Sequence, residues 1–314
     1  MTVIDLHTLK EAQAPEHSVL CLGNFDGVHL GHRALVAEVL SKKEQLIKKY
    51  PDLKCGAWFF RRPPIDILTG KTTALLTDNA QKLAFFSSLG LDYAFICDFE
   101  EIGDFSPQKF VSDVLKKDCG CIFAVCGYNF KFGNKALGDA KLLNQLMDGN
   151  SSTVDQVMLG DESISSSKIR GLIAEGDIIK ANTLLGRKFT IHGQVLHGKK
   201  LGRTIGIPTI NQELASNSAM LKRGIYISRT YVDGKWLPSV SNIGIRPSVE
   251  DSHKLNCETY ILGFDRDIYG QDVAVEFHCR LRDEQKFDSV EDLKAQITKD
   301  IKNTEIYFKK EQEA

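Results

Sequence analysis

The stretch LGNFDGVHLGH, residues 22–32, decides how the first half of the chain folds. It holds three glycines, one acid and two histidines. It follows an apolar run, SVLCLG, and leads directly into a helical pattern, so it joins a strand to the N-terminus of a helix. Backbone N–H groups at such a junction bind anions, and glycines let a phosphate chain approach the backbone closely. The stretch therefore predicts a phosphate site formed by Gly23, Asn24, Phe25, Asp26, Gly27 and Gly31.

Two histidines strengthen this interpretation. His29 and His32, three residues apart across the first helical turn, can lie on one side of the helix and face the same ligand. Imidazoles there could donate hydrogen bonds to phosphate oxygens as charge develops during transfer. The alternative is a tight turn with two surface histidines, which either histidine alone would favour. The dinucleotide fingerprint G-x-G-x-x-G does not occur, and TGKT at 69–72 lacks the P-loop glycine, because that position is Ile65.

Strands and helices alternate through the first part of the chain. The apolar runs SVLCLG, CGAWFF, YAFICDF and CIFAVCG predict buried strands, and residues 32–49, 77–90 and 106–117 repeat apolar side chains at helical spacing. Helices are expected to start at Thr77 or Asp78, and at Ser106-Pro107. This alternation predicts an α/β fold, a doubly wound, Rossmann-like parallel sheet whose ligands bind beyond the carboxyl ends of the strands.

The pattern changes after a helical segment at 169–185. FTIHGQVLHG, GIYISRTYV, LNCETYIL and VAVEFHCRL alternate apolar and polar residues, and Asp233-Gly234 between two of these runs predicts a hairpin turn. Because no helix separates them, these strands predict a small antiparallel β-barrel. A final helix is expected to begin at Asp288, with Glu291 completing a capping box. We therefore expect two domains, 1–185 and 186–314.

Composition limits the classes of partner. The chain has 314 residues, a formal net charge of −1 and a pI of about 6.7, which predicts no broad binding to nucleic acid or to membranes. No apolar run approaches the roughly 18 residues of a membrane span, and the N-terminus lacks a signal-peptide core. The eight cysteines form no CxxC pairs, which favours buried reduced thiols over disulfides or zinc. We expect a cytoplasmic protein; the sequence predicts no oligomeric state.

Three segments in order resemble one known family. GNFDGVHLGH resembles the HxGH-type signature of the nucleotidyltransferase superfamily, in the form of the adenylyltransferase module of bacterial bifunctional riboflavin kinase/FAD synthetases. CGYNFKFGNKALGD, at 126–139, and ISSSKIRGLIAEGDI, at 164–178, are also similar to that module. The resemblance implies ATP phosphate contacts from His29 and His32, flavin nucleotide contacts from Asn129, and triphosphate contacts from Ser166, Ser167 and Arg170. His29, His32 and Arg170 are the catalytic candidates of this module. Without the resemblance, SSSKIR predicts a capped helix start and Asn129 a turn.

The chain departs from that family at one point. Where the family has Phe-x-Pro-His-Pro after the second strand, this sequence reads FFRRPP, with Arg61 and Arg62 in place of the Pro-His pair. Arginines can still bind phosphate, but the flavin side of the site is then expected to differ. Ser167 replaces the usual threonine and keeps the hydroxyl group.

A second glycine-rich segment lies in the C-terminal part. GKKLGRTIGIPTIN, residues 198–211, places Thr209 and Asn211 on either side of Ile210 in an extended segment, so their side chains can face the same way. Hard oxygen ligands of this kind suit Mg²⁺, which keeps waters and substrate phosphates in its shell. An isolated PTIN would more often be an ordinary strand entry.

This segment resembles the glycine-rich and Pro-Thr-x-Asn motifs of riboflavin kinase. The similarity continues through SNIGIRPSV, LNCETYILGFDRDIYG and VEFHCRLRDEQKF, over most of the second domain. It implies that the backbone around Gly202 and Gly206 approaches ATP, and that Thr209 and Asn211 hold the metal. Glu258 matches the family's catalytic glutamate, which would accept the proton of the riboflavin 5′-hydroxyl. Arg246 could support the phosphates or pair with a carboxylate.

The resemblances together imply a bifunctional enzyme of flavin cofactor synthesis. The barrel would phosphorylate riboflavin with Mg-ATP to give FMN, and the first domain would transfer AMP from a second ATP to FMN, giving FAD and pyrophosphate. The alternatives are a riboflavin kinase whose nucleotidyltransferase domain is impaired or differently specific, and a non-catalytic flavin-binding regulator.

Overall fold

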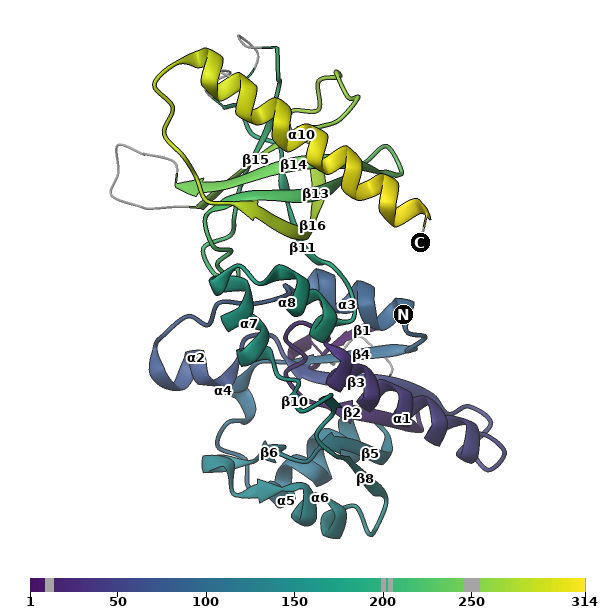
Figure 1. The fold of residues 1–314 in the computed structure, drawn as a ribbon. Helices are drawn as coiled ribbons and strands as arrows, with labels where there is room; N and C mark the ends of the chain where they lie inside the picture. The colour runs from purple at the N-terminus through teal and green to yellow at the C-terminus, as the bar shows by residue number, and fades with distance from the viewer. Residues whose placement is uncertain (9–13, 199–201, 203–205, 246–254, 314) are drawn as a thin grey trace. The chain divides into compact units, whose positions relative to one another are not determined.

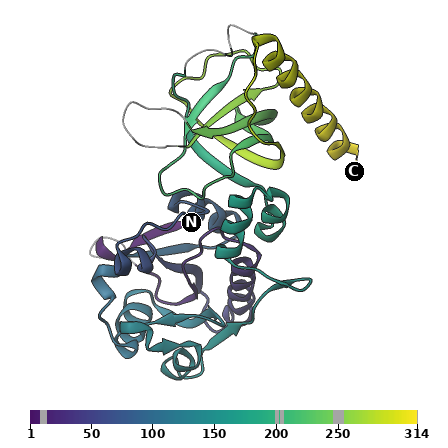
Figure 2. The same cartoon turned by 60° about the vertical axis from the view of Figure 1, so that its left-hand side comes forward.

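The computed structural model describes residues 1–8, 14–198, 202, 206–245 and 255–313. The chain divides into two compact units, Met1–Ser166 and Ser167–Ala314, drawn as ribbons in Figures 1 and 2. Arg246, considered above as a phosphate or carboxylate partner, lies outside the described residues. Each unit is described by itself.

The first unit is built on a six-stranded parallel sheet. Its strand order is β1-β4-β3-β2-β5-β8, and every neighbouring pair in it is parallel. The strands are β1 (Thr2–Asp5), β2 (Ser18–Leu22), β3 (Lys54–Phe60), β4 (Tyr93–Cys97), β5 (Cys121–Gly127) and β8 (Ser151–Val154). Four of them, β2 to β5, are the strands predicted from the apolar runs. The predicted doubly wound parallel sheet is confirmed.

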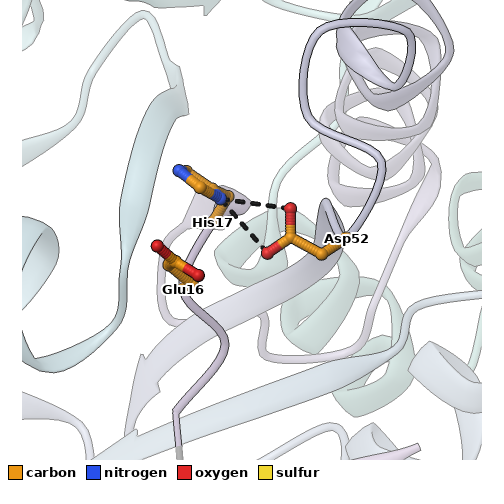
Figure 3. Close-up of side chains that lie close together, drawn as sticks. All are labelled: Glu16, His17 and Asp52. Atoms are coloured by element: carbon orange, nitrogen blue, oxygen red, sulfur yellow. Dashed lines mark hydrogen bonds and ion pairs between the residues drawn. The ribbon is translucent and has the colours of Figure 1, made fainter.

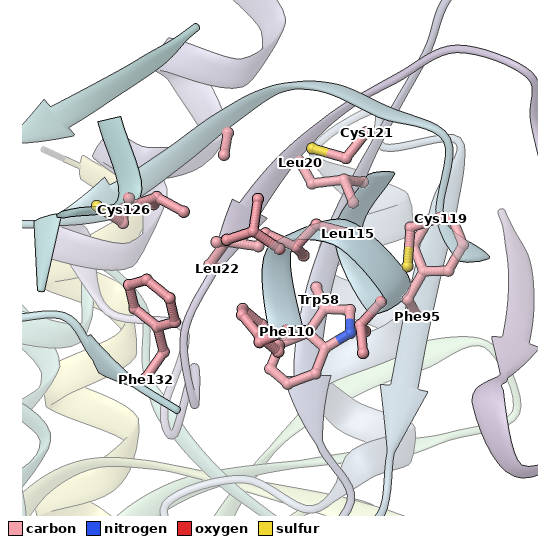
Figure 4. Packing of buried hydrophobic residues seen from close by; sticks show 14 of the residues in the cluster. Leu20, Leu22, Trp58, Phe95, Phe110, Leu115, Cys119, Cys121, Cys126 and Phe132 are labelled. Carbon is pink, nitrogen blue, oxygen red and sulfur yellow. The ribbon is translucent and has the colours of Figure 1, made fainter. Parts of the chain in front are cut away.

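Both faces of this sheet are buried, which explains the continuous apolar runs. On β2, Val19 and Cys21 belong to the core cluster on one face, and Leu20 and Leu22 to the cluster on the other. Figure 4 shows the second cluster, in which the Trp58 ring lies beside the Phe110 ring. Fully burying one such large side chain stabilises the fold by roughly 1.5–3 kcal/mol.

Helices and short strand pairs complete the first unit. The helices are η1 (Leu6–Thr8), α1 (Leu30–Leu46), α2 (Pro64–Thr69), α3 (Asn79–Ser88), α4 (Phe99–Ile102), α5 (Pro107–Lys109), the π-helical η2 (Phe110–Asp118), η3 (Asn134–Ala136) and α6 (Ala140–Leu146). The strand pairs are β6 (Lys131–Phe132) with β7 (Gly138–Asp139), and β9 (Met158–Leu159) with β10 (Glu162–Ser163). Asp78 caps α3 in a capping box with Gln81, and Ser106 caps α5 before Pro107. Both predicted helix starts are confirmed.

The order of the strands fixes where a ligand can bind. The chain runs from β2 to β3 and β4 on one side, whereas β5 and β8 lie on the other side of β2. The connection after β2 therefore leads to strands on one side of β2, and the connection after β5 leads to a strand on the other side. Such a switch point, at the carboxyl ends of the strands, is where open α/β sheets hold ligands. The loop that follows Leu22 starts at this position.

The second unit contains an antiparallel barrel. The strand order is β11-β16-β13-β14-β15-β12, and an isolated bridge between Leu196 and Asn211 closes it. The predicted hairpin turn at Asp233-Gly234 joins β13 to β14, with positive φ at both residues. The strands are β11 (Phe189–Gln194), β12 (Ile210–Glu213), β13 (Gly224–Val232), β14 (Lys235–Ile245), β15 (Leu255–Ile261) and β16 (Asp272–Arg282). The predicted barrel is confirmed.

Two helices, α7 (Ser166–Glu175) and α8 (Ile178–Leu185), precede the barrel and group with it. Gly176, at a φ of 86°, separates them. The side-chain amide of Asn182 donates to the carbonyl of Phe277 on β16 at 2.8 Å and accepts from the backbone N–H of Phe189 on β11 at 2.6 Å. This buried asparagine attaches α8 to two barrel strands.

The last helix, α10 (Val290–Glu313), runs along the outside of the barrel (Figures 1 and 2). Its cap differs from the prediction of Asp288 with Glu291. The Ser289 hydroxyl accepts from the backbone N–H of Asp292 at 3.1 Å and donates to the Asp292 carboxylate at 2.6 Å. Two overlapping cap patterns are present in this sequence, and the hydroxyl one residue later forms the cap.

Candidate functional sites

The loop after β2 has a strained backbone. Phe25, Gly27 and Val28 have positive φ angles of 53°, 86° and 39°. Val28 is β-branched, and such residues adopt this region only at a cost of about 1–3 kcal/mol. The side chains of Phe25 and Val28 are fully buried in a core cluster, which holds the backbone in this conformation. Strain that the surrounding core enforces is characteristic of ligand-binding loops.

The Asp26 side chain fixes this loop to the start of α3. Its carboxylate accepts hydrogen bonds from the backbone N–H groups of Leu76, at 2.8 Å, and Thr77, at 3.2 Å. The Thr77 hydroxyl in turn accepts from the backbone N–H of Gly27 at 2.9 Å. Asp26 is 7% exposed, so its carboxylate is largely occupied in holding the loop. Of the other loop residues, Asn24 is exposed and Gly23 half-buried.

His29 and His32 lie on the same side, as their spacing predicts, and their rings are stacked. Their ring centroids are 3.6 Å apart and the planes differ by 15°. His29 is the N-cap of α1, and its ring nitrogen Nδ1 accepts from the backbone N–H of His32 at 3.3 Å. A Cβ atom at Gly31 would lie 3.2 Å from the His29 ring, so glycine makes room for the stack. Both rings therefore lie at the N-terminus of α1, where the helix dipole favours anions.

His32 is uncharged at neutral pH. Burial lowers its pKa well below 6.5, and positive charge on His29 and on Lys82 adds to that effect. Lys82 is itself 3% exposed, and its ammonium group lies 5.5 Å from the Phe59 ring centroid. Within the described part of the chain, Nδ1 of His32 has no hydrogen-bond partner. A neutral imidazole with an unused ring nitrogen can form one directional hydrogen bond to a phosphate oxygen.

Two further predicted residues of the nucleotide site lie close to this edge of the sheet. Asn129 is exposed in the turn after β5, the strand next to β2. The hydroxyl of Ser166, the last residue of the first unit, donates to the backbone carbonyl of Asp26 at 2.8 Å. Ser167 and Arg170 follow in α7 and belong to the second unit, where the Arg170 guanidinium donates to the Ser167 hydroxyl at 3.0 Å.

The two arginines that depart from the family pattern have different surroundings. The Arg61 guanidinium forms ion pairs with Asp98, at 3.0 Å, and with Asp5. These pairs connect the carboxyl ends of β1, β3 and β4, so most of the Arg61 charge is already compensated. Arg62 is exposed. The structure therefore gives the adjacent arginines separate roles, with Arg62 the one directed to solvent.

On the barrel, Glu258 and Asn211 lie opposite each other in neighbouring strands. They are direct partners in the register of β15 and β12. Asn256, two residues before Glu258, has a side-chain amide that donates to the Asn211 oxygen at 3.2 Å and to the Glu258 carboxylate at 3.3 Å. One buried amide thus connects the predicted base to a predicted metal ligand. Sequence reasoning missed Asn256, although the period of two along a strand places it on the face of Glu258.

A cavity of about 540 Å³ lies beside Glu258. At one end of its wall, Arg282 and the buried Asp300 of α10 form an ion pair at 2.7 Å. The remaining wall is mostly apolar. Its lining includes Ile225, Val240, Asn242, Tyr260, Leu293 and Ile297. An apolar pocket with a few polar groups is typical of a site for a flat organic ligand.

A second cavity, of about 420 Å³, shares one wall residue with the first. Thr209 lines both. The second cavity is lined further by Val195, Ile210, Phe264, Arg266 and Tyr269. A ligand in one cavity and a ligand in the other can therefore both reach the Thr209 hydroxyl.

The glycines of the second motif allow a close backbone approach. A Cβ atom at Gly202 would lie 2.3 Å from the carbonyl oxygen of Ile207, so only glycine fits there. The backbone N–H of Ile207 donates to the Gly202 carbonyl at 2.8 Å, so Gly202 lies beside the segment that leads to Thr209. Gly206 has a φ of 81° and open space around it. A Cβ atom at Gly202 would also lie 3.5 Å from the Thr209 hydroxyl oxygen, so Gly202 is next to Thr209.

One cluster of potential metal ligands lies elsewhere. Glu16, His17 and Asp52 lie close together before β2 and β3, at the sheet edge opposite the loop after β2 (Figure 3). The His17 ring nitrogen is 3.2 Å from each Asp52 carboxylate oxygen, and this hydrogen bond lowers the pKa of Asp52. Both acids are exposed. The group is a surface ion pair with a neighbouring acid, and we assign it no catalytic role.

Comparison with protein families connects these sites to known enzymes. Residues 11–168 match the family model described as FAD synthetase, and residues 185–308 match the model described as riboflavin kinase. A bifunctional riboflavin kinase/FMN adenylyltransferase from Escherichia coli (strain K12) is 36% identical over 310 residues, covering 96% of this chain and 96% of the relative. The chain belongs to the bifunctional riboflavin kinase/FMN adenylyltransferase family. The resemblance stated from the motifs is confirmed.

Other members and a solved structure agree with the family. The Listeria monocytogenes bifunctional riboflavin kinase/FMN adenylyltransferase is 34% identical over 302 residues, covering 94% of this chain and 93% of that relative. A crystal structure from Streptococcus pneumoniae, named a macrolide-efflux protein, has a TM-score of 0.88 at 27% identity and covers 97% of this chain and 99% of its own. That name concerns the other protein, and the likeness extends over both units. In the described part of this chain, no helix is long and apolar enough to cross a membrane.

Proposed function

We propose that this member of the family synthesises FMN and FAD with two separate sites. The barrel transfers the γ-phosphate of ATP to riboflavin, and the nucleotidyltransferase unit transfers AMP from a second ATP to FMN. Matches to both family models over nearly the whole chain support the pair of activities. The observation that carries the kinase assignment is the Asn256 amide, which connects Glu258 to Asn211.

In the kinase reaction, we assign the flavin to the larger cavity and the ATP phosphates to the side of Thr209. Glu258 accepts the proton of the riboflavin 5′-hydroxyl as that oxygen attacks the γ-phosphorus. A new P–O bond forms to the flavin, the bond between the γ-phosphorus and the bridging oxygen breaks, and ADP leaves. The glycine loop at Gly202 and Gly206 borders the phosphates.

Thr209 and Asn211 are the residues that would hold Mg²⁺. Their side-chain oxygens are hard ligands, and the Asn211 oxygen retains a second lone pair beside the one that accepts from Asn256. The residues present therefore fit a magnesium ion. When bound, it would neutralise charge on the phosphates, while the chain's own Glu258 handles the proton.

In the adenylyltransferase reaction, a phosphate oxygen of FMN attacks the α-phosphorus of ATP and pyrophosphate leaves. His29, His32 and the backbone of 23–27, with Gly31, bind ATP phosphates at the N-terminus of α1, where positive helix-dipole potential stabilises developing charge. Asn129 contacts the flavin nucleotide. Ser166, Ser167 and Arg170 bind the triphosphate, following the family resemblance. No covalent enzyme intermediate is required.

The test is product analysis with one substitution in the barrel. Glu258→Gln keeps the shape of the side chain and an oxygen for the Asn256 amide but removes the base. We expect it to lower riboflavin phosphorylation at least a hundredfold, since general-base catalysis contributes about 10²–10⁴-fold. FMN adenylylation should stay within twofold of the unsubstituted chain. The reciprocal control is Arg170→Ala, which should lower FAD formation from FMN and spare FMN formation.

The same assay separates the alternatives. A kinase with an impaired or differently specific nucleotidyltransferase unit would accumulate FMN and form no FAD from FMN and Mg-ATP. A regulator without turnover would form neither product. Loss of both activities in Glu258→Gln, with the fold intact, would contradict two separate sites.

The remaining proposals concern boundaries and surroundings. We propose a functional boundary at 185/186, supported by the start of the riboflavin kinase match at residue 185. We propose location in the cytoplasm, supported by eight cysteines that are all free thiols. Small molecules are the proposed partners, without nucleic acid, in keeping with a net charge of −1.

A further inference from the structure

The larger barrel cavity contains a buried polar atom that the proposed chemistry does not use. The side-chain oxygen of Asn242 is inaccessible to solvent and has no hydrogen-bond partner among the described residues. Several buried side-chain polar atoms of the described residues lack a hydrogen-bond partner. Among them, the Asn242 oxygen is the one that belongs to a residue lining one of the two barrel cavities. Leaving such an atom unpaired costs about 1–3 kcal/mol. Asn242 lines the cavity, so its carboxamide is within reach of a ligand there.

Asn242 belongs to a continuous row of side chains across five strands. In the register of the barrel, Asn211 pairs with Glu258, Glu258 with Asn242, Asn242 with Ile225, and Ile225 with Arg282. Directly opposed residues in antiparallel strands face the same side, and neighbouring strands lie about 4.8 Å apart. The last four residues of the row line the cavity. Asn242 is therefore one strand spacing from Glu258, on the side away from Asn211.

The row matches the layout of the substrate. Riboflavin has a flat aromatic ring system, apolar at its dimethylbenzene end, and a ribityl chain with four hydroxyl groups, of which the terminal one reacts. If the reacting hydroxyl lies at Glu258, the chain leads past Asn242 before the ring reaches the apolar wall at Ile225 and Val240. A carboxamide can both accept from and donate to a hydroxyl group. No other side chain in the row between Glu258 and Ile225 offers hydrogen bonds.

We propose that Asn242 is a specificity residue of the kinase site that binds an internal ribityl hydroxyl and thereby holds the 5′-hydroxyl against Glu258. This proposal rests on the proposed kinase function. It assigns Asn242 to recognition of the polyol chain, separate from phosphate, metal and proton transfer. A site that hydrogen-bonds a substrate hydroxyl rejects analogues that lack it much more strongly than an apolar pocket does.

The experiment combines a substitution with a trimmed ligand. Asn242→Leu keeps the approximate shape and removes the hydrogen bonds, and Asn242→Ala is a smaller second variant in case leucine disturbs the fold. Riboflavin and lumiflavin, which has the same ring without the ribityl chain, are titrated onto the full-length chain by quenching of flavin fluorescence. We expect each variant to weaken riboflavin binding about tenfold and to leave lumiflavin binding within twofold.

Kinetics supply the second readout. We expect kcat/KM for riboflavin to fall about tenfold to a hundredfold, with the KM for ATP and FMN adenylylation unchanged. The deoxyriboflavin that lacks the bound hydroxyl, at the 3′ or the 4′ position, should show the same kcat/KM with wild-type and variant chains. The matched control is Ser241→Ala, because Ser241 faces the side of β14 opposite to Asn242 and is bonded there to Ser228 of β13. This variant should leave the KM for riboflavin unchanged.

The outcomes distinguish a failure of the Asn242 assignment from a failure of the proposed kinase function. Equal weakening of riboflavin and lumiflavin binding, or unchanged riboflavin binding, would overturn the role of Asn242 even if FMN is formed. A ribityl-dependent loss of binding in a chain that forms no FMN would instead sustain Asn242 and contradict the kinase function.

Discussion

The buried His32, one member of the stacked histidine pair, couples the stability of the first unit to pH. Because burial lowers the pKa of His32 below its usual 6.5, the folded chain leaves this ring neutral where the unfolded chain binds a proton. The unfolded state therefore gains protons as the pH falls through 6.5, and the folded state loses stability relative to it.

This predicts a measurable loss in acid. Between pH 7.5 and 5.5, His32 alone should lower the free energy of unfolding of the first unit by about 1.4 kcal/mol. His32→Phe keeps a ring beside Phe25 but cannot titrate, so its stability should fall less over the same range. Urea unfolding at the two pH values measures the difference. Identical pH dependence in both chains would show that His32 protonates equally in the folded and unfolded states.

Some contacts of single residues could be predicted from the sequence, and others could not. That His29 and His32 share one side was predictable, because residues three apart across a helical turn are neighbours, whereas their stacking was not predicted. The bonds from Asp26 to Leu76 and Thr77 were not, since they depend on how the sheet brings two distant loops together. For the same reason Arg61 was a phosphate candidate by sequence, whereas the fold pairs it with Asp5 and Asp98.

At the scale of elements, the loop after β2 depends on its attachment to α3. Asp26→Ala would leave the backbone N–H groups of Leu76 and Thr77 buried without acceptors. We expect a loss of about 2–4 kcal/mol in the stability of the first unit and a fall in FMN adenylylation. Riboflavin phosphorylation, assigned to the barrel, should be unaffected.

Asp26→Asn is the matched control for that change. Its amide oxygen can still accept from both backbone groups, so it should retain most of the stability and of the adenylyltransferase activity. Thermal unfolding and the FMN-to-FAD assay measure the two effects. If alanine and asparagine variants behaved alike, the negative charge and not the loop attachment would be the important property of Asp26.

Strands that are buried on both faces were easier to predict from the sequence than the exposed edge strand. Strands β2 to β5 are buried on both faces, so their apolar runs were visible in the sequence. The edge strand β1 has two exposed residues in its short TVID sequence, and such a pattern does not distinguish a strand from a loop. At α10, the competing caps at Asp288 and Ser289 could be separated only by the observed hydrogen bonds.

At the scale of the whole molecule, the packing of α7 and α8 sets where the chain can be divided. The buried residues of α8 include Ile178, Ala181, Leu184 and Leu185, and Asn182 is bonded to two barrel strands. A fragment of residues 167–314 keeps these contacts, whereas a fragment of 186–314 loses them. We expect the longer fragment to be more stable by several kcal/mol, since each large buried side chain contributes about 1.5–3 kcal/mol.

Thermal unfolding of the two fragments checks this expectation, with riboflavin phosphorylation as a test of the folded barrel. Equal unfolding temperatures would show that α7 and α8 add nothing to the barrel.

The family and both folds were predictable here, because the order of several motifs along the chain is specific. The attachment of α8 was not, since it depends on one buried asparagine whose partners are almost a hundred residues apart.

The closure of the barrel provides a way to measure occupancy of the proposed kinase site. Among the described residues, one isolated β-bridge joins the segment just after the edge strand β11 to the edge strand β12. In it, the Leu196 N–H donates to the carbonyl of Asn211 at 2.8 Å. The seam of the barrel thus passes through the backbone of a proposed metal ligand. Exchange of the Leu196 amide hydrogen with heavy water would report how often this seam opens. A metal–nucleotide complex held by Asn211 would slow that exchange, so one amide records the occupancy of the site.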